Sequence, residues 1–221
     1  MSFARTAHVI LLVCLAAVTA EAQEWDSAAV GVKAGTLGLG LDGTFSLTEK
    51  VNLRINGNLF NFSYDREIDD IDYDLDLDLQ TFMLLVDWHP FDNGFRVSAG
   101  AVQNNNDASL DAAPSDNETI GGTTYTPAQL GTITGDLAFD SLVPYIGIGY
   151  GNAVAPGQAW SFVFDLGLMI QDYDVDLSVS GPVALLPSFQ TDLREEEAKV
   201  QDDFDDIRIY PVVSAGIAYH F

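Results

Sequence analysis

Five aspartates at alternate positions are the residues of this 221-residue sequence that most obviously suggest chemistry. Asp70, Asp72, Asp74, Asp76 and Asp78 share one face of a β-strand, because successive side chains of a strand point to opposite sides. Like charges about 6.5 Å apart repel each other unless water or cations neutralise them. This acidic ridge is therefore either a solvated strand face or a weak cation-binding surface.

The ridge does not have the pattern of a dedicated calcium loop. An EF-hand loop that begins at Asp70 would need glycine at its sixth position and glutamate at its twelfth, and these positions hold Leu75 and Thr81. We therefore predict no firm metal site and no cofactor.

Four charged residues occupy the polar faces of predicted strands. Arg54, Asp87 and Arg96 fall on three consecutive strands, each a few residues from a short turn, and Asp165 falls on a fourth. Charges that faced lipid would be very costly, so we expect all four to point inward and to pair. Inside a narrow barrel they form either a structural ionic plug or a gated polar pathway.

The histidines do not favour an enzyme. Beyond residue 22 the sequence holds only His89 and His220, both predicted at the end of the strands that carries the short turns. A hydrolase acting on external substrates would need its histidine and carboxylate at the opposite rim. No spacing among the aspartates singles out a catalytic pair, so we expect no enzymatic activity.

The elements that position these residues are strands with a period of two. The clearest is 160–170, where Trp160, Phe162, Phe164, Leu166, Leu168 and Ile170 alternate with polar and small residues. No apolar run after residue 23 is long enough for a membrane helix, so a membrane-spanning structure would have to be a closed barrel. Turns delimit strands at 37–47, 51–65, 71–89, 94–104, 134–150, 159–179 and 207–221.

Two places along these strands are ambiguous. An even strand number requires an eighth strand at about 27–34, followed by a tight turn near Gly35-Thr36, and the alternative is one bent strand over residues 28–47. The apolar parity of 71–79 is opposite to that of 82–88, which predicts a bulge or shift near Leu79.

The long connections alternate with the short turns and lie near 65–70, 103–135 and 181–206. The last holds a second acidic cluster: Asp192, Glu195, Glu196, Glu197, Asp202, Asp203, Asp205 and Asp206. Leu193, Val200, Phe204 and Ile207 recur at near-helical spacing, with Thr191 as a possible N-cap. We expect a short amphipathic helix, either across the barrel mouth or facing solvent.

The N-terminal segment has the layout of a cleaved secretory signal. Residues 1–22 contain Arg5, an apolar stretch of about ten residues and the triplet Ala20-Glu21-Ala22. The stretch is short for the alternative, an uncleaved membrane anchor. The only cysteine, Cys14, lies in this segment, so the mature domain, 23–221, has no thiol and no disulfide.

The formal net charge of −24 excludes nucleic acid as a charge-driven partner and favours cations, although solubility alone also accounts for it. The last strand ends in Tyr219-His220-Phe221. A terminal strand that ends aromatic-x-Phe resembles the insertion signal of bacterial outer-membrane barrels. The chain as a whole resembles the small eight-stranded barrels of the OmpA, OmpW and opacity-protein kind.

The resemblance implies an all-β, antiparallel, up-and-down transmembrane barrel in the outer membrane of a Gram-negative bacterium. It implies lipid, lipopolysaccharide and the barrel-assembly machinery as partners, with Tyr219 and Phe221 as the assembly signal. Two function classes follow. One is a structural or porin-like, narrow, cation-preferring channel with an acidic mouth, and the other is a surface protein whose acidic loops bind divalent or organic cations or an external partner.

Overall fold

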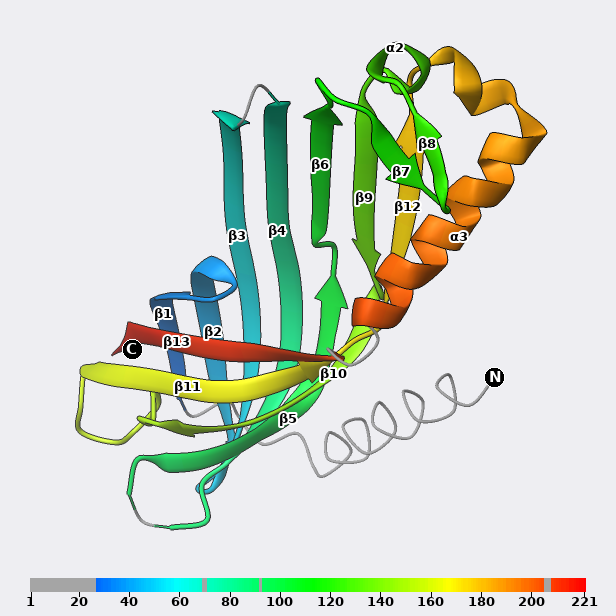
Figure 1. Ribbon diagram of the computed structural model, residues 1–221. Helices are drawn as coiled ribbons and strands as arrows, with labels where there is room; N and C mark the ends of the chain where they lie inside the picture. Colours follow the sequence, from blue (N-terminus) through cyan, green and yellow to red (C-terminus); the bar gives the residue numbers. More distant parts are fainter. Residues whose placement is uncertain (1–26, 69–70, 92, 205–207) are drawn as a thin grey trace.

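The chain folds into a closed antiparallel β-barrel (Figure 1). A computed structural model describes residues 27–68, 71–91, 93–204 and 208–221, so the predicted signal segment lies outside the described residues. In the described part, eight strands form the ring: β1 (Ala28–Gly35), β2 (Gly38–Thr48), β3 (Val51–Ile68), β4 (Ile71–Trp88), β5 (Phe95–Asn104), β10 (Leu142–Tyr150), β11 (Trp160–Ile170) and β13 (Ile209–His220). The ring closes because β13 pairs with β1 and β5 pairs with β4, which confirms the predicted barrel.

Alternation along each strand sorts the side chains into an inner and an outer set. On β11, Phe162, Leu166 and Leu168 are exposed, whereas the intervening Asp165 and Gly167 are buried. The outward residues of the other strands extend this surface into an apolar belt that includes Val30, Val32, Leu39, Leu41, Leu59, Phe82, Leu84, Ile146, Ile148, Val213 and Ile217. Such a belt is the lipid-facing surface of a transmembrane barrel.

Strands β1 and β2 form a tight hairpin. β1 ends at Gly35 and β2 begins at Gly38, whose φ of +93° lies in the left-handed region that favours glycine. A Cβ added to Gly38 would lie 2.4 Å from the Cβ of Phe60, so the turn packs directly on β3. The expected tight turn is present, and the alternative of one bent strand over residues 28–47 is wrong.

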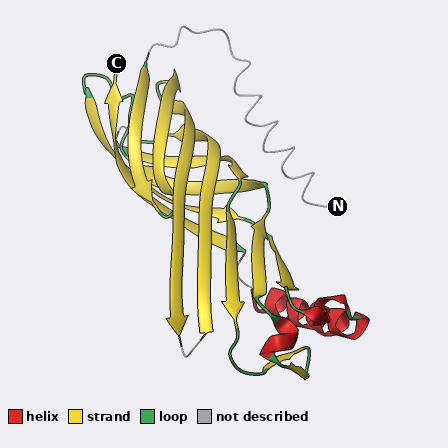
Figure 2. Cartoon of the chain, turned by 90° about the horizontal axis from the view of Figure 1, so that it is seen from above, coloured by secondary structure: helices red, strands yellow, loops and turns green. Residues whose placement is uncertain are grey.

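Beyond the barrel, β3 and β4 continue and three further strands join them in an open sheet, here called the extension sheet (Figures 1 and 2). It consists of residues 60–68 of β3, residues 71–80 of β4, β6 (Asp107–Ala113), β9 (Ile133–Phe139) and β12 (Tyr173–Val179), in the order β3-β4-β6-β9-β12. The strands expected at 134–150 and 159–179 are therefore each divided into a barrel part and an extension part. β6 lies in a stretch expected to be a polar connection, because its small alanines are a weak strand signal.

The two longest strands pair without interruption. β3 and β4 keep one register from Val51 opposite Trp88 to Ile68 opposite Ile71, so the expected bulge near Leu79 is wrong. The apolar side chains change face instead. Phe82 and other even-numbered residues of β4 point outward in the barrel, whereas in the extension sheet the odd-numbered residues 73–79 are apolar and the even-numbered ones are acidic. The apolar residues of β4 move from the outer to the inner face where the outer face leaves the apolar belt, because an outer face in water favours charged residues.

The helix expected between the last strands is α3 (Pro187–Phe204). Its Phe189 and Leu193 are buried in a small core with a hairpin, β7 (Glu118–Ile120) and β8 (Thr123–Tyr125), and two short helices, α2 (Pro127–Leu130) and η1 (Pro182–Leu185). This core packs on β9 and β12 through Ile133, Leu177 and Val179. No helix among the described residues is long and apolar enough to cross a membrane.

α3 differs in detail from the expected helix. It has 18 residues and begins before Thr191, whose hydroxyl donates to the carbonyl of Pro187 at 3.2 Å, so Thr191 is not the N-cap. Of the apolar residues that predicted the helix, Leu193 is buried and Val200 is half-buried. Ile207 and the side chain of Phe204 lie outside the described part of the chain.

α3 also covers one edge of the extension sheet. Edge strand β12 would otherwise present unpaired backbone groups, which can recruit other strands. The amide of Val175 donates to Gln201 Oε1 at 3.1 Å, the amide of Leu177 donates to Glu197 Oε1 at 3.0 Å, and Gln201 Nε2 donates to the carbonyl of Tyr173 at 2.8 Å. Helix side chains thus replace a neighbouring strand.

Removing both helix side chains with Glu197→Ala and Gln201→Ala should expose the β12 edge. Each lost hydrogen bond is worth about 1 kcal/mol, so we expect the amides of Val175 and Leu177 to exchange roughly fivefold faster or more. Hydrogen exchange of the folded protein in detergent measures this. Glu195→Ala, an exposed position on the same helix, is the matched control, and equal exchange in both proteins would contradict the edge-covering role.

Candidate functional site

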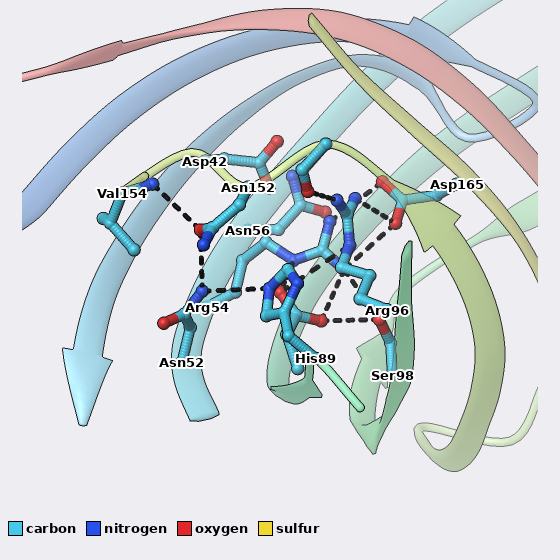
Figure 3. A network of polar contacts seen from close by, with 12 residues as sticks. Asp42, Asn52, Arg54, Asn56, His89, Arg96, Ser98, Asn152, Val154 and Asp165 are labelled. Carbon is cyan, nitrogen blue, oxygen red and sulfur yellow. Dashed lines mark hydrogen bonds and ion pairs between the residues drawn. The ribbon is translucent and has the colours of Figure 1, made fainter. Parts of the chain in front are cut away.

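The barrel interior holds a compact ionic cluster whose residues come from β3, β4, β5 and β11 (Figure 3). Arg54 lies between two carboxylates: its Nε is 2.9 Å from Asp87 Oδ2 and its Nη1 is 2.9 Å from Asp165 Oδ2. Arg96 Nη2 donates to Asp165 Oδ1 at 2.7 Å, and its Nε is 3.9 Å from Asp87. The structure brings together all four residues that the sequence analysis assigned to this cluster.

Asp165 is the centre of the cluster. It bridges both arginines, whereas Asp87 has close contacts with Arg54 and with Ser98, whose hydroxyl donates to Asp87 Oδ1 at 2.5 Å. Arg96 also donates to backbone carbonyls of Gly151 and Phe164. All four charged side chains are 2–3 % exposed. Close contacts between two positive and two negative charges, bidentate between Arg54 and Asp165, offset much of the cost of taking each charge out of water.

A second ion pair lies in the interior and was not predicted. Lys33 Nζ on β1 is 3.4 Å from Asp42 Oδ1 on β2, and both side chains are buried. The sequence did indicate that Lys33 and Asp42 point inward, because each alternates with outward apolar residues of its strand. Three of the nine basic residues of the sequence are thus inside the barrel, and three aspartates balance them. The charged residues described inside the barrel therefore contribute nothing to the net charge of −24.

Polar and apolar layers fill the barrel on either side of the ionic cluster. On the side of the short turns, Asn52 Nδ2 contacts His89 Nε2 at 3.2 Å and Asn152 Oδ1 at 3.2 Å. On the other side, a layer of eight buried apolar residues crosses the interior: Leu37, Met83, Leu85, Val102, Val143, Tyr145, Met169 and Val212. The space left beside the ionic cluster is about 10 Å³, roughly that of one water molecule.

Both histidines lie at the end of the barrel with the short turns, as the sequence predicts. His89 faces the interior, and His220 Nε2 is 2.5 Å from Ser27 Oγ, whose hydroxyl is also 3.4 Å from the carbonyl of Val154. These contacts join the first and last strands to the turn that follows β10. They place the imidazoles at the opposite end of the barrel from the extension sheet.

The acidic ridge belongs to a wider face of the extension sheet. Asp74, Asp76 and Asp78 are exposed on the outer face, whereas Asp70 and the side chain of Asp72 are outside the described part. The same face carries Asp65, Asp107, Asp111, Asp136, Asp174 and Asp176, and several are cross-strand neighbours: Asp65 with Asp74, Asp74 with Asp111, Asp78 with Asp107, and Asp136 with Asp176. We call this surface the acidic face.

The acidic face spreads its charge over five strands and does not concentrate it at one point. In the described part of the chain, no group of three or more histidine, cysteine, aspartate or glutamate side chains has the arrangement of a metal site. Thr134 Oγ1 donates to Asp111 Oδ1 at 2.6 Å, which satisfies one carboxylate locally. The face as a whole produces a broad negative field that attracts cationic groups.

The second acidic cluster has a structural use that the sequence did not reveal. The hydroxyl of Tyr125 donates to Asp192 Oδ2 at 2.6 Å, and this hydrogen bond lowers the pKa of Asp192 below its ordinary value. Glu196 accepts hydrogen bonds from Lys199 at 2.9 Å and from the amide of Gly121 at 3.2 Å, which lower its pKa too. Together with Glu197, which accepts a hydrogen bond from the amide of Leu177 on β12, these carboxylates hold α3 against the hairpin and the sheet. Asp205 and Asp206 are outside the described residues.

An aromatic group marks the rim at the short turns. The rings of Trp160 on β11 and Tyr219 on β13 lie 4.9 Å apart, and Tyr219 packs edge-on against Phe221 at 5.3 Å. All three are exposed. Aromatic residues at this level are typical of the girdles that flank the apolar band of membrane barrels.

Comparison with solved structures finds similar barrels, among them two from one organism. CarO2 of Acinetobacter baumannii superposes with a TM-score of 0.60 at 20% sequence identity, over 88% of this chain and 98% of that one. CarO of the same organism gives a TM-score of 0.54 at 19% identity, over 88% and 97% of the two chains. No protein-family model and no curated protein matches the chain. The likeness shows the fold, and the narrower resemblance to the OmpA, OmpW and opacity proteins stays a prediction.

Asp165→Ala should destabilise the barrel more than Asp87→Ala, because Asp165 bridges both arginines. Removing one partner of a buried ion pair typically costs roughly 3–5 kcal/mol, since it leaves an uncompensated charge. Denaturant unfolding in detergent, followed by the mobility of unheated samples on gels, measures the midpoints. The double change Asp165→Ala with Arg96→Ala should recover part of the loss. A larger effect of Asp87→Ala would contradict the central position of Asp165.

Phe221→Ala should lower the amount of protein in the outer membrane severalfold if Tyr219 and Phe221 form the assembly signal. The measurement is immunoblotting of outer-membrane fractions. Phe91→Ala is the matched control, because Phe91 is an exposed aromatic residue in the turn between β4 and β5, off the last strand. Equal levels of both variants would exclude a special role for Phe221.

Proposed function

We propose that this protein is an outer-membrane barrel that displays its extension sheet at the cell surface as an interaction surface. The apolar belt and the aromatic rim support the membrane location. The short turns then face the periplasm and the extension sheet faces outward. Outer-membrane lipid, lipopolysaccharide and the barrel-assembly machinery are the partners that this location entails.

The filled interior is the observation that carries the proposal. The ionic cluster and the apolar layer lie in series along the barrel, and an ion that crossed both would have to displace paired charges and then buried apolar side chains. This favours a structural role for the barrel over a narrow cation-preferring channel. The interior of an eight-stranded barrel is narrow enough for side chains to fill it, so a blocked interior is expected for this strand number.

The extension sheet is where the chain meets other molecules in this proposal. It lies on the side of the barrel away from the short turns and carries the acidic face, whose negative field favours divalent cations, organic cations and basic protein segments over anionic partners. Bridging of lipopolysaccharide by divalent cations is one such contact. We propose no catalytic role for the surface.

Planar-bilayer recordings test the closed barrel. We expect the native protein to produce no stepwise conductance, because both layers block the interior. Asp165→Ala, which breaks the cluster but leaves the apolar layer, should also be silent. Stepwise, cation-selective currents from the native protein would overturn the closed-barrel proposal in favour of the channel, with a known porin as the positive control for insertion.

A further inference from the structure

The two edges of the extension sheet are treated differently by the fold. The β12 edge is covered by Gln201 and Glu197 of α3. At the other edge, β2 pairs with β3 only as far as Leu39 opposite Leu59, where the chain turns at Gly38. β3 then continues to Ile68, and within the described residues only β4 pairs with this part of it. We call residues 60–66 of β3 the open edge.

The register shows which backbone groups point outward at the open edge. The carbonyl of Lys50 accepts a hydrogen bond from the amide of His89 at 2.8 Å. Hydrogen-bonded pairs alternate along an antiparallel ladder, and the β3–β4 register is unbroken, so the even-numbered residues of β3 bond to β4. The odd-numbered residues Asn61, Ser63 and Asp65 therefore direct their amides and carbonyls away from the sheet.

Side chains at the open edge form two distinct strips. On the inner face Phe60, Phe62 and Tyr64 stack in a row, with centroids 6.4 and 6.1 Å apart and nearly parallel rings, and each side chain is 41–45 % exposed. On the outer face, Asn61, Ser63 and Asp65 lie next to the aspartates of β4. An added strand would place alternate side chains against an aromatic strip and against the acidic face.

We propose that the open edge binds a basic, extended segment of an external protein as an additional strand. This rests on the proposed role of the extension sheet and names the class of its partner. Main-chain hydrogen bonds would supply affinity and the two strips would supply specificity, as in other cases of β-strand addition. The matching segment has lysine or arginine alternating with apolar residues over about six to eight positions.

Charge complementarity selects this occupant over a second copy of the chain. Within the described residues the interior charges balance, whereas the acidic face carries unbalanced aspartates and adjoins the open edge. Two copies joined edge to edge would bring two acidic faces into one continuous sheet. Like charges on neighbouring strands are destabilising, whereas lysine side chains of a basic segment would be attracted.

The test uses the full-length protein in a zwitterionic detergent and the end-blocked octapeptide Lys-Val-Lys-Ile-Lys-Val-Lys-Ile as probe, with calorimetry as readout. The same peptide methylated at every backbone nitrogen keeps its charge and side chains but has no amide donors. We expect it to bind about tenfold more weakly or worse. Equal affinity of the two peptides would mean that charge alone holds them, and would overturn strand addition.

Ser63→Pro provides a second, independent arm. Its proline removes an amide that points to the open edge and none that bonds to β4, so edge strands tolerate it. We expect the probe to bind this variant about tenfold more weakly, while Ser63→Ala binds it as the native protein does. Native-like affinity of a folded Ser63→Pro variant would overturn the proposal. If this variant does not fold, the methylated peptide decides.

The oligomeric state of the protein tests the remaining alternative, that a second copy of the chain occupies the open edge. A concentration-dependent dimer that Ser63→Pro abolishes and the basic peptide does not disperse would assign the open edge to a second copy, and would overturn the basic segment. Failure of these arms leaves the bilayer result unchanged, because conductance depends on the barrel interior. The two proposals therefore fail separately.

Discussion

Every backbone amide and carbonyl of a strand needs a hydrogen-bond partner. Most features of this protein follow from how the strands meet that need, first in the barrel and then in the extension sheet. At the level of the apolar belt the barrel is surrounded by lipid, which cannot form hydrogen bonds with an unpaired strand edge. The strands must therefore form a closed ring there. The pairing of β13 with β1 and of β5 with β4 closes it. Past the belt, closure is no longer required, and five strands form an open sheet.

The open sheet has two edges that the chain handles by different means. On β12 the side chains of Gln201 and Glu197 bond to edge backbone groups in place of a strand. This coverage depends on the anchoring of α3 by Tyr125, Gly121 and a buried core around Phe189. The uncovered edge of β3 stands out because the same fold protects the other one. The acidic face is then a charged surface beside a strand edge whose outward backbone groups pair with no other described strand.

The interior obeys a second constraint, the cost of burying charge. Arg54 and Arg96 can be buried inside the barrel only because Asp165 and Asp87 neutralise their charges at hydrogen-bond distance. Alternation requires some residue at every inward position of each strand, and polar residues there must find partners across the barrel. The resulting contacts link β3, β4, β5 and β11, so the cluster also ties together strands that are not all neighbours in the ring.

Much of this architecture could be predicted from local patterns. The period of two on β11 and β13, the short turns and the inward parity of Arg54, Asp87, Arg96 and Asp165 are properties of residues close in sequence, and a strand's geometry converts them directly into faces. The same logic failed near Leu79, where a change of apolar parity suggested a bulge. The strand is regular there, and its surroundings change instead.

What only the tertiary structure decided involves partners distant in sequence. The pairing of Lys33 with Asp42, the place of Asp165 between two arginines and the joining of β6 to the sheet depend on which strands become neighbours. α3 covers β12 through Glu197 and Gln201, which in the sequence are only two polar residues of an acidic helix. A side chain's type and spacing determine the face it takes on its own strand or helix, whereas the identity of its partner depends on closure of the ring and docking of α3, which no local pattern encodes.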